Sequence, residues 1–218
     1  NHEDWWRAFW GRSWIHVTSD VSAVGSPQIP RNAHPFRIGV DQDGGNRFAG
    51  EFGRVSIFNT ALTDGSIRKL ADGDRSAETV ERSDLLYDGV PEIASAIPEL
   101  TDEAFEGGAT IAVWVRPGRL PGGGARLIDK ITPGANDGIL LDTYPGNSLR
   151  LIVGDRIAAK AGVLPVGQWS HVAAVVASGV MRLFLNGQPI AGDANGAITG
   201  SDGFVVSRAY ALQRFITA

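Results

Sequence analysis

The sequence predicts an all-β protein, an antiparallel sandwich of two sheets with short helical segments at both chain ends. Three observations support this prediction. Short apolar runs with strand-like alternation recur along the chain, 28 glycines and 11 prolines are spread between them, and 43% of the 218 residues are hydrophobic. The chain is therefore long and apolar enough for one sandwich and an accessory piece.

Both chain ends show the three- and four-residue spacing of amphipathic helices. Near the start, this spacing is shown by Trp6, Phe9, Trp10 and Trp14. Near the end, it is shown by Val205, Val206, Ala209, Leu212, Phe215 and Ile216. We therefore expect helical flanks at 1–20 and 204–218 around a sandwich at 21–203, and we expect the tryptophans near the start to form a packing stripe.

Two extended runs follow the first flank, over 36–40 and 48–58. The sequence Asp-Gly-Gly-Asn between them is typical of a hairpin turn. The two runs are therefore expected to pair as a hairpin.

A short helix is expected next, with Thr63 as its N-cap and with Ile67 and Leu70 as its apolar side chains. Asp72 and Gly73 are expected to end it. Residues 72–84 are charged and contain almost no large apolar side chains, which indicates a surface linker.

Six further strands are expected after this linker, because apolar segments recur at regular spacing and most are separated by turn residues. The expected strands are 109–116, 126–131, 138–143, 148–154, 169–177 and 180–186. The turns are expected at Pro117-Gly118, Pro133-Gly134, Pro145-Gly146 and Asn186-Gly187.

Composition and the lack of certain motifs exclude several classes of function. The net charge is −4 and no basic cluster lies beside a row of aromatics, which argues against a nucleic-acid partner. The chain has no cysteine, so disulfides and cysteine-ligated zinc are excluded. No apolar run reaches the roughly 20 residues of a membrane span. The sequence also lacks HExxH, GxSxG, P-loop and GxGxxG motifs.

Three stretches resemble the laminin-G-like, concanavalin A-like jelly roll, namely 110–117 (TIAVWVRP), 167–173 (GQWSHVA) and 183–187 (LFLNG). The segments that normally follow them in that family lie upstream instead, at 36–39 (FRIG), 48–51 (FAGE), 55–59 (VSIFN) and 61–62 (AL). Two arrangements fit this order. The chain holds either the tail of one such domain followed by most of another, or a single circularly permuted sandwich in which the linker near 72–84 joins the usual ends. Permutation is favoured, because the ends of compact domains often lie close together.

The flanks resemble a bacterial glycoside-hydrolase-like family built on a six-hairpin helical toroid. The matching residues are 5–15 (WWRAFWGRSWI) and 208–215 (RAYALQRF). A chain that starts at Asn1 and stops at Ala218 within a helical pattern suggests a piece of a longer protein. The resemblance implies a sandwich inserted in a secreted or periplasmic bacterial hydrolase, whose acid and base would lie beyond Ala218.

One loop carries a candidate metal site. Asp41, Asp43 and Asn46 place oxygens close together, as calcium requires, and calcium sites occur at loop rims of the family that the chain resembles. The spacing does not match an EF-hand, and ordinary hairpin-turn chemistry is the favoured alternative. Asp137 and Asp142 would add ligands to this site only if the fold brought their loops close to Asp41 and Asp43.

Two turns carry candidate ligand-binding residues, because aromatic and polar side chains on turns are free to meet a glycan. They are Tyr144 with Asn147, and Asn136 with Asp137. Plain solvated turns remain the favoured alternative for both.

Trp114 and Trp169 are expected to pack in the core, although either indole could stack on a sugar. The Glu-x-Asp-x-x-Glu motif of some concanavalin A-like glucanases is absent, including around Glu99, Asp102 and Glu103. We therefore expect no catalysis within this chain. The leading hypothesis is a carbohydrate-recognition or substrate-positioning module, with a polysaccharide or glycan and the host catalytic domain as partners. The alternative is a structural spacer that binds no ligand.

Overall fold

The structure is a computed structural model that describes residues 29–73, 85–98, 100, 105, 108–177, 180–194, 197–198 and 204–207. The expected helix at 1–20, most of the linker at 72–84 and residues 208–218 lie outside the described residues. No described helix is long and apolar enough to cross a membrane.

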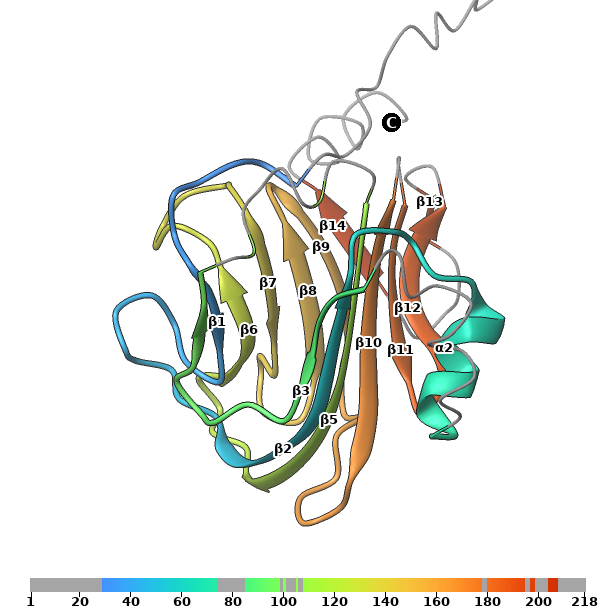
Figure 1. The fold of residues 1–218 in the computed structure, drawn as a ribbon, viewed down its shortest axis with the longest axis horizontal. Helices are drawn as coiled ribbons and strands as arrows, with labels where there is room; N and C mark the ends of the chain where they lie inside the picture. Colours follow the sequence, from blue (N-terminus) through green and yellow to red (C-terminus); the bar gives the residue numbers. More distant parts are fainter. Residues whose placement is uncertain are drawn as a thin grey trace, which may run out of the picture.

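Two seven-stranded sheets form the fold, and the strand pairs of both are antiparallel (Figure 1). Sheet A contains, in spatial order, β14 (Phe204–Ser207), β9 (Arg156–Lys160), β8 (Leu149–Val153), β7 (Ile139–Asp142), β6 (Arg126–Lys130), β1 (Phe36–Ile38) and β4 (Ala96–Ile97). Sheet B contains β13 (Ala197–Ile198), β12 (Gln188–Ala194), β11 (Val180–Leu185), β10 (Ser170–Ala177), β5 (Ala109–Arg119), β2 (Ala49–Phe58) and β3 (Leu85–Gly89). The predicted two-sheet antiparallel sandwich is confirmed.

The main core lies between the two sheets, where alternate side chains of facing strands meet. In β5, Ile111, Val113 and Val115 point inward and are almost completely buried. In β7 and β8 the inward side chains include Leu141 and Leu151, which lie directly opposite each other in the register. This alternation, which is visible in the sequence, fixes which face of each strand is left outside.

The segment that contains β1 and β2 contributes interior strands to both sheets. In sheet A, β1 lies between β4 and β6, and in sheet B, β2 lies between β3 and β5. The strand expected at 48–58 therefore shares sheet B with those expected at 109–116, 169–177 and 180–186, whereas the strand expected at 36–40 lies in sheet A, beside β6. A separate tail domain is excluded, because each of these strands pairs with strands from the later part of the chain.

The predicted hairpin between 36–40 and 48–58 is wrong, because β1 and β2 belong to different sheets. A backbone hydrogen bond from Phe48 N to Gly39 O, of 2.9 Å, closes the turn between them. Gly39 then has a φ of +73°, which glycine adopts without strain and which turns the chain away from β1. The connection is thus a sandwich corner at which the chain passes from one sheet to the other.

Helix α2 (Asp64–Ala71) covers part of the outer face of sheet B (Figure 1). The Thr63 side chain accepts a hydrogen bond from Ser66 N at 3.2 Å, which confirms the predicted N-cap. Below the helix, a second apolar cluster joins it to the sheet; its members are Phe58, Leu62, Ile67, Leu70, Ala112, Ala173, Val175 and Phe184. One part of this outer face is therefore buried by α2.

The terminal flank begins later than the sequence predicts. Residues 204–207 form β14, which pairs with β9 at the edge of sheet A, so the helix expected from Val205 is wrong for this stretch. Val205 and Val206 are also β-branched residues, which favour strands. The sandwich therefore extends past its expected boundary at 203.

Candidate functional site

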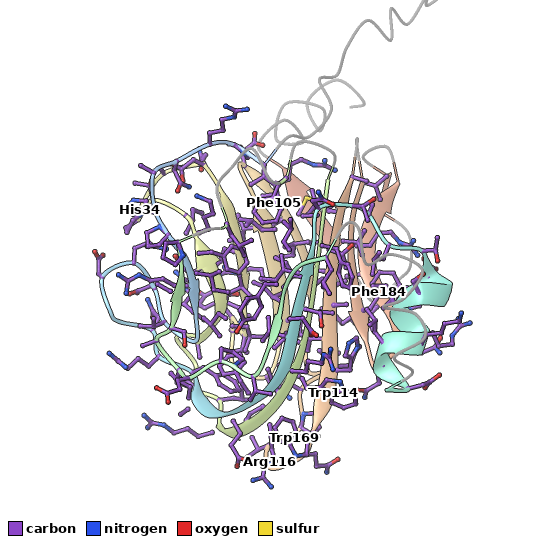
Figure 2. All side chains as sticks on the ribbon, in the orientation of Figure 1. His34, Phe105, Trp114, Arg116, Trp169 and Phe184 are labelled. Atoms are coloured by element: carbon purple, nitrogen blue, oxygen red, sulfur yellow. The ribbon has the colours of Figure 1, made fainter. Side chains whose placement is uncertain are left out.

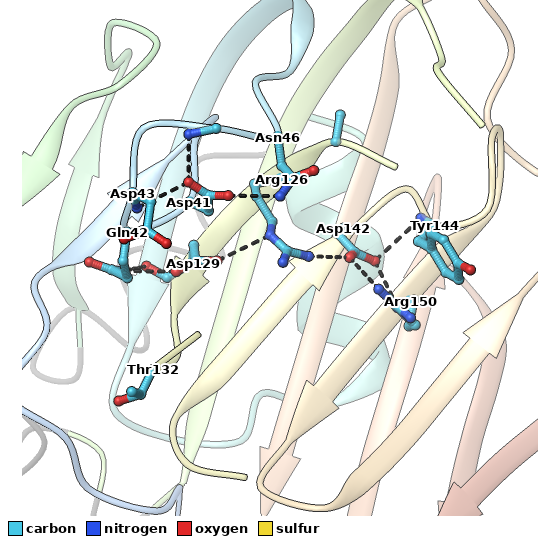
Figure 3. Close-up of polar contacts among 12 residues, drawn as sticks. Asp41, Gln42, Asp43, Asn46, Arg126, Asp129, Thr132, Asp142, Tyr144 and Arg150 are labelled. Carbon is cyan, nitrogen blue, oxygen red and sulfur yellow. Dashed lines mark hydrogen bonds and ion pairs between the residues drawn. The ribbon is translucent and has the colours of Figure 1, made fainter. Parts of the chain in front are cut away.

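One end of sheet A brings together residues from three separate parts of the chain (Figure 3). The 41–46 turn contacts the start of β6 through a 2.8 Å hydrogen bond from Arg126 N to Asn46 O. Arg126 lies opposite Asp142, the last residue of β7, and Asp142 lies opposite Arg150 of β8. We call Arg126, Asp142 and Arg150 the rim network.

The Asp41 carboxylate is occupied by its own loop. Oδ1 accepts hydrogen bonds from Gly45 N at 2.6 Å and from Asp43 N at 3.1 Å, and Oδ2 accepts one from Asn46 Nδ2 at 2.7 Å. Among the described residues, no group of three or more His, Cys, Asp or Glu side chains is placed to hold a metal ion. The geometry is that of a side-chain-stabilised turn. Calcium binding stays a prediction, and it would require Asp41 to exchange these donors for the ion.

Asp142 is the centre of the rim network. It lies on the outer face of sheet A, yet only 1% of it is exposed, because two arginines cover it. Oδ2 accepts from Arg126 Nη1 and Arg150 Nη2, both at 2.6 Å, and Oδ1 accepts from Arg150 Nε at 3.0 Å. Charge-assisted bonds of this kind fix both guanidinium groups in place.

Asp129 extends the network toward the Asp41 turn. Gln42 Nε2 donates to its Oδ1 at 2.8 Å, and Arg126 Nε lies 3.2 Å from its Oδ2 as an ion pair without hydrogen-bond alignment. Burial raises the pKa of the Asp129 carboxyl, while the Gln42 hydrogen bond and the Arg126 charge oppose this rise. Both acids of this face are therefore enclosed by partners and do not reach solvent.

Tyr144 is an exposed aromatic residue at this end. It follows β7 directly, its side chain is 43% exposed, and the Arg150 guanidinium lies over its ring, 4.3 Å from the centroid. Its backbone N–H donates to Asp142 Oδ1 at 3.3 Å. Asn147 is exposed in the same turn, and its carbonyl accepts from the N–H groups of 163 and 164. The structure thus brings Tyr144 and Asn147 together above the rim network.

Asn136 and Asp137 lie elsewhere, before the first residue of β7 and so at the opposite end of that strand from Tyr144. Asp137 Oδ1 accepts from Thr132 N at 2.7 Å and from Asn32 Nδ2 at 3.2 Å. Burial would raise its pKa, but the hydrogen bonds from Thr132 and Asn32 outweigh burial and lower it. Asp137 therefore holds its loop together, and of the two residues only Asn136 is exposed.

The prediction that Trp114 and Trp169 pack in the core is wrong. Trp114 is half-buried on the outer face of sheet B, and Trp169 is 43% exposed. Arg116 lies beside them at the same end of the sheet (Figure 2). Strand alternation could have revealed the position of Trp114, since it shares its face of β5 with the charged Arg116 rather than with Val113 and Val115.

His171 lies next to this surface and is buried. Its ring is 5.3 Å from that of Trp114, and its Nδ1 has no hydrogen-bond partner in the part of the chain that the structure describes. Burial lowers the pKa of His171 to about 4. The imidazole is therefore neutral at physiological pH.

The two facing antiparallel sheets define a β-sandwich. Residues 94–215 match the family described as the concanavalin A-like lectin/glucanases superfamily (Laminin_G_3). This match covers more than half of the chain, so the chain belongs to that superfamily. Comparison with curated proteins and with solved structures finds no match.

Proposed function

We propose that the chain is a non-catalytic carbohydrate-recognition module that binds a polysaccharide or glycan at the Tyr144 turn. The observation that carries this proposal is the exposed Tyr144 ring, backed by an arginine that a buried carboxylate holds in place. Protein–glycan sites commonly use an aromatic ring for the apolar face of a sugar and nearby polar groups for its hydroxyls. Membership of a lectin and glucanase superfamily is compatible with this function.

A catalytic role for the same surface is not supported. Glycosidases place two carboxyl groups on either side of the scissile bond. The two acids of this face, Asp129 and Asp142, are each 1% exposed and already engaged by arginine or glutamine side chains. A sugar at the Tyr144 turn would therefore meet the Tyr144 ring and the edges of the arginines rather than the carboxylates of Asp129 and Asp142.

We also propose how this sandwich is placed within a longer parent protein. The sandwich is circularly permuted relative to its family and forms an insert in a secreted or periplasmic bacterial glycoside hydrolase, whose catalytic domain is its partner. Family segments that occur upstream in the sequence and pair with later strands support the permutation. In the parent protein, removal of the insert should lower activity on a polymeric substrate and leave activity on a small soluble substrate unchanged.

Affinity electrophoresis of the whole chain in gels that contain different plant and microbial polysaccharides tests the binding function. We expect retardation by at least one polymer, with a dissociation constant on the order of micromolar to millimolar, because an open turn buries little area. No reducing sugar should be released. Retardation should weaken in Tyr144→Ala and Asn147→Ala, whereas Asn136→Ala, which changes an exposed turn residue at the other end of β7, should behave as wild type.

The alternative is a structural spacer without a ligand. A folded chain that no glycan retards, in the presence and absence of calcium, would favour the spacer. Sugar release by the purified chain would contradict both.

A further inference from the structure

The outer face of sheet B is only partly covered by α2. Along β5 the outward side chains are Thr110, Ala112, Trp114 and Arg116. The loop before α2 covers Thr110, and the apolar cluster below α2 includes Ala112 but not Trp114. Figure 2 shows Trp114, Trp169 and Arg116 together at the far end of the sheet from Phe105. We call the group of Glu51, Gly53, Trp114, Arg116 and Trp169 the indole face.

The Trp169 indole is held against the sheet by the sequence around it. A Cβ on Gly53 would lie 2.9 Å from Trp114 Cβ and 3.3 Å from Trp169 Cζ3, so only glycine lets the two indoles approach this strand. The register of β2 against β5 shifts at this place, between Phe52 and Val55. Such bulges are frequent beside binding sites, where they re-aim side chains.

The loop that carries Trp169 is fixed at its other side as well. Gly167 N donates to Pro117 O at 2.7 Å, which ties the loop to the end of β5. The Arg116 guanidinium lies over the Trp169 ring, 5.6 Å from its centroid. The exposed indole is thus supported from two strands and needs little reordering to meet a ligand, which limits the entropic cost of binding.

The charges beside the indole indicate the class of ligand. Arg116 forms an ion pair with Glu51 across β5 and β2, and both side chains remain exposed. Because the pair is neutral as a whole, it offers no excess positive charge to a phosphate, sulfate or uronate group. It does offer N–H donors and carboxylate acceptors side by side, which suit neighbouring hydroxyl groups of a neutral sugar.

We propose that the indole face is a second glycan-binding site, separate from the Tyr144 turn, for neutral β-1,4-linked pyranosyl chains. Sugars with equatorial hydroxyls present a flat C–H face to an indole and their hydroxyls to the Arg116–Glu51 pair. This inference rests on the proposed carbohydrate-binding function. The two sites belong to opposite sheets, and packed sheets are about 10 Å apart, so one sugar unit cannot contact both.

Titration calorimetry of the whole chain with cellohexaose and xylohexaose tests the second site. Trp169→Ala should weaken binding of at least one of these probes tenfold or more, and Arg116→Gln should weaken it to a smaller extent. Val166→Ala is the matched control, because Val166 is an exposed apolar residue of the same loop and makes no contact that the proposal uses. Thermal melting of each variant shows whether it is folded. Trp169→Phe, which keeps an aromatic ring at this position, should retain part of the affinity for the probe.

The variants also separate this inference from the proposed function. Tyr144→Ala should leave binding at the indole face intact, and the double variant with Trp169→Ala should bind nothing. If Trp169→Ala binds like wild type while Tyr144→Ala does not, the second site is wrong and the proposed function stands. If wild type binds neither neutral probes nor polysaccharides, both are wrong. Binding of heparin or polygalacturonate at the indole face, or dimerisation that depends on Trp169, would also overturn the inference.

Discussion

Buried His171 should make the fold sensitive to mild acid. In the unfolded chain a histidine titrates near pH 6.5, whereas in the folded chain burial lowers the pKa of His171 to about 4. Above pH 6.5 the imidazole is neutral in both states. As the pH falls from 6.5 toward 4, His171 binds a proton in the unfolded state but not in the folded state. The free energy of unfolding therefore decreases over this pH range.

The size of this loss follows from the two pKa values. A difference of about 2.5 units, at 1.36 kcal/mol each, amounts to about 3 kcal/mol in full, of which about 2 kcal/mol is lost by pH 5. This is a large part of the 5 to 15 kcal/mol by which domains are typically stable. We expect His171→Phe, which keeps a ring against Trp114 without a titrating group, to show a pH profile flatter by that amount.

Urea unfolding followed by tryptophan fluorescence, at several pH values between 4.5 and 7.5, measures this difference. Other acids contribute equally to wild type and variant. The lowered pKa values of Asp64 and Asp137 act mainly below pH 3.8, and the raised pKa of Asp129 acts with the opposite sign, since its contribution is lost as pH rises. Parallel profiles for wild type and His171→Phe would refute the reasoning.

Three further outcomes are expected. Gly138→Ala should destabilise the fold by more than about 3 kcal/mol in urea unfolding, because its Cβ would lie 1.7 Å from the Lys130 carbonyl oxygen of β6. Gly134→Ala, at a similar positive φ but in open space, should cost about 1 kcal/mol. Equal losses of stability in the two variants would contradict this. Asp142→Asn should lower the free energy of unfolding by about 3 kcal/mol, because it leaves Arg126 and Arg150 without their carboxylate. An unchanged urea midpoint would show that water satisfies the two arginines equally well. If the Asp41 turn binds calcium, millimolar Ca²⁺ should raise the melting temperature, and Asp41→Ala combined with Asp43→Ala should abolish the rise. If Ca²⁺ does not change the melting temperature of wild type, the Asp41 loop is an ordinary turn without a metal site.

Local patterns predict most of the strands but not the way they are joined. The six strands expected after the linker all form, within a few residues of their expected bounds. β9 (RIAAK) and β12 (QPIAGDA) were not predicted, because neither shows a clear alternation of large apolar side chains. The prediction of a hairpin over 36–58 is wrong for another reason. A turn sequence shows that the chain reverses direction, but it does not show whether the two strands beside it belong to the same sheet.

The candidate sites depend even more on tertiary structure. The turn at Asp41 could be predicted from its own residues, because its hydrogen bonds are local. The bonds of Asp142 to Arg126 and Arg150 depend on the register of three strands, which the sequence does not specify by itself. Trp169 lies just before β10, outside the strand, so strand alternation does not predict which way its side chain points.

The interior positions of β1 and β2 determine when this fold can form during synthesis. Both strands leave the ribosome before the strands that flank them in each sheet, so β2 must wait for β5 and β1 for β6. Long-range pairing of this kind slows folding, because a large loop must close before its contacts form. The same arrangement predicts that residues 29–73 and 85–207, supplied as two separate peptides, reassemble into one sandwich, and that neither peptide folds without the other.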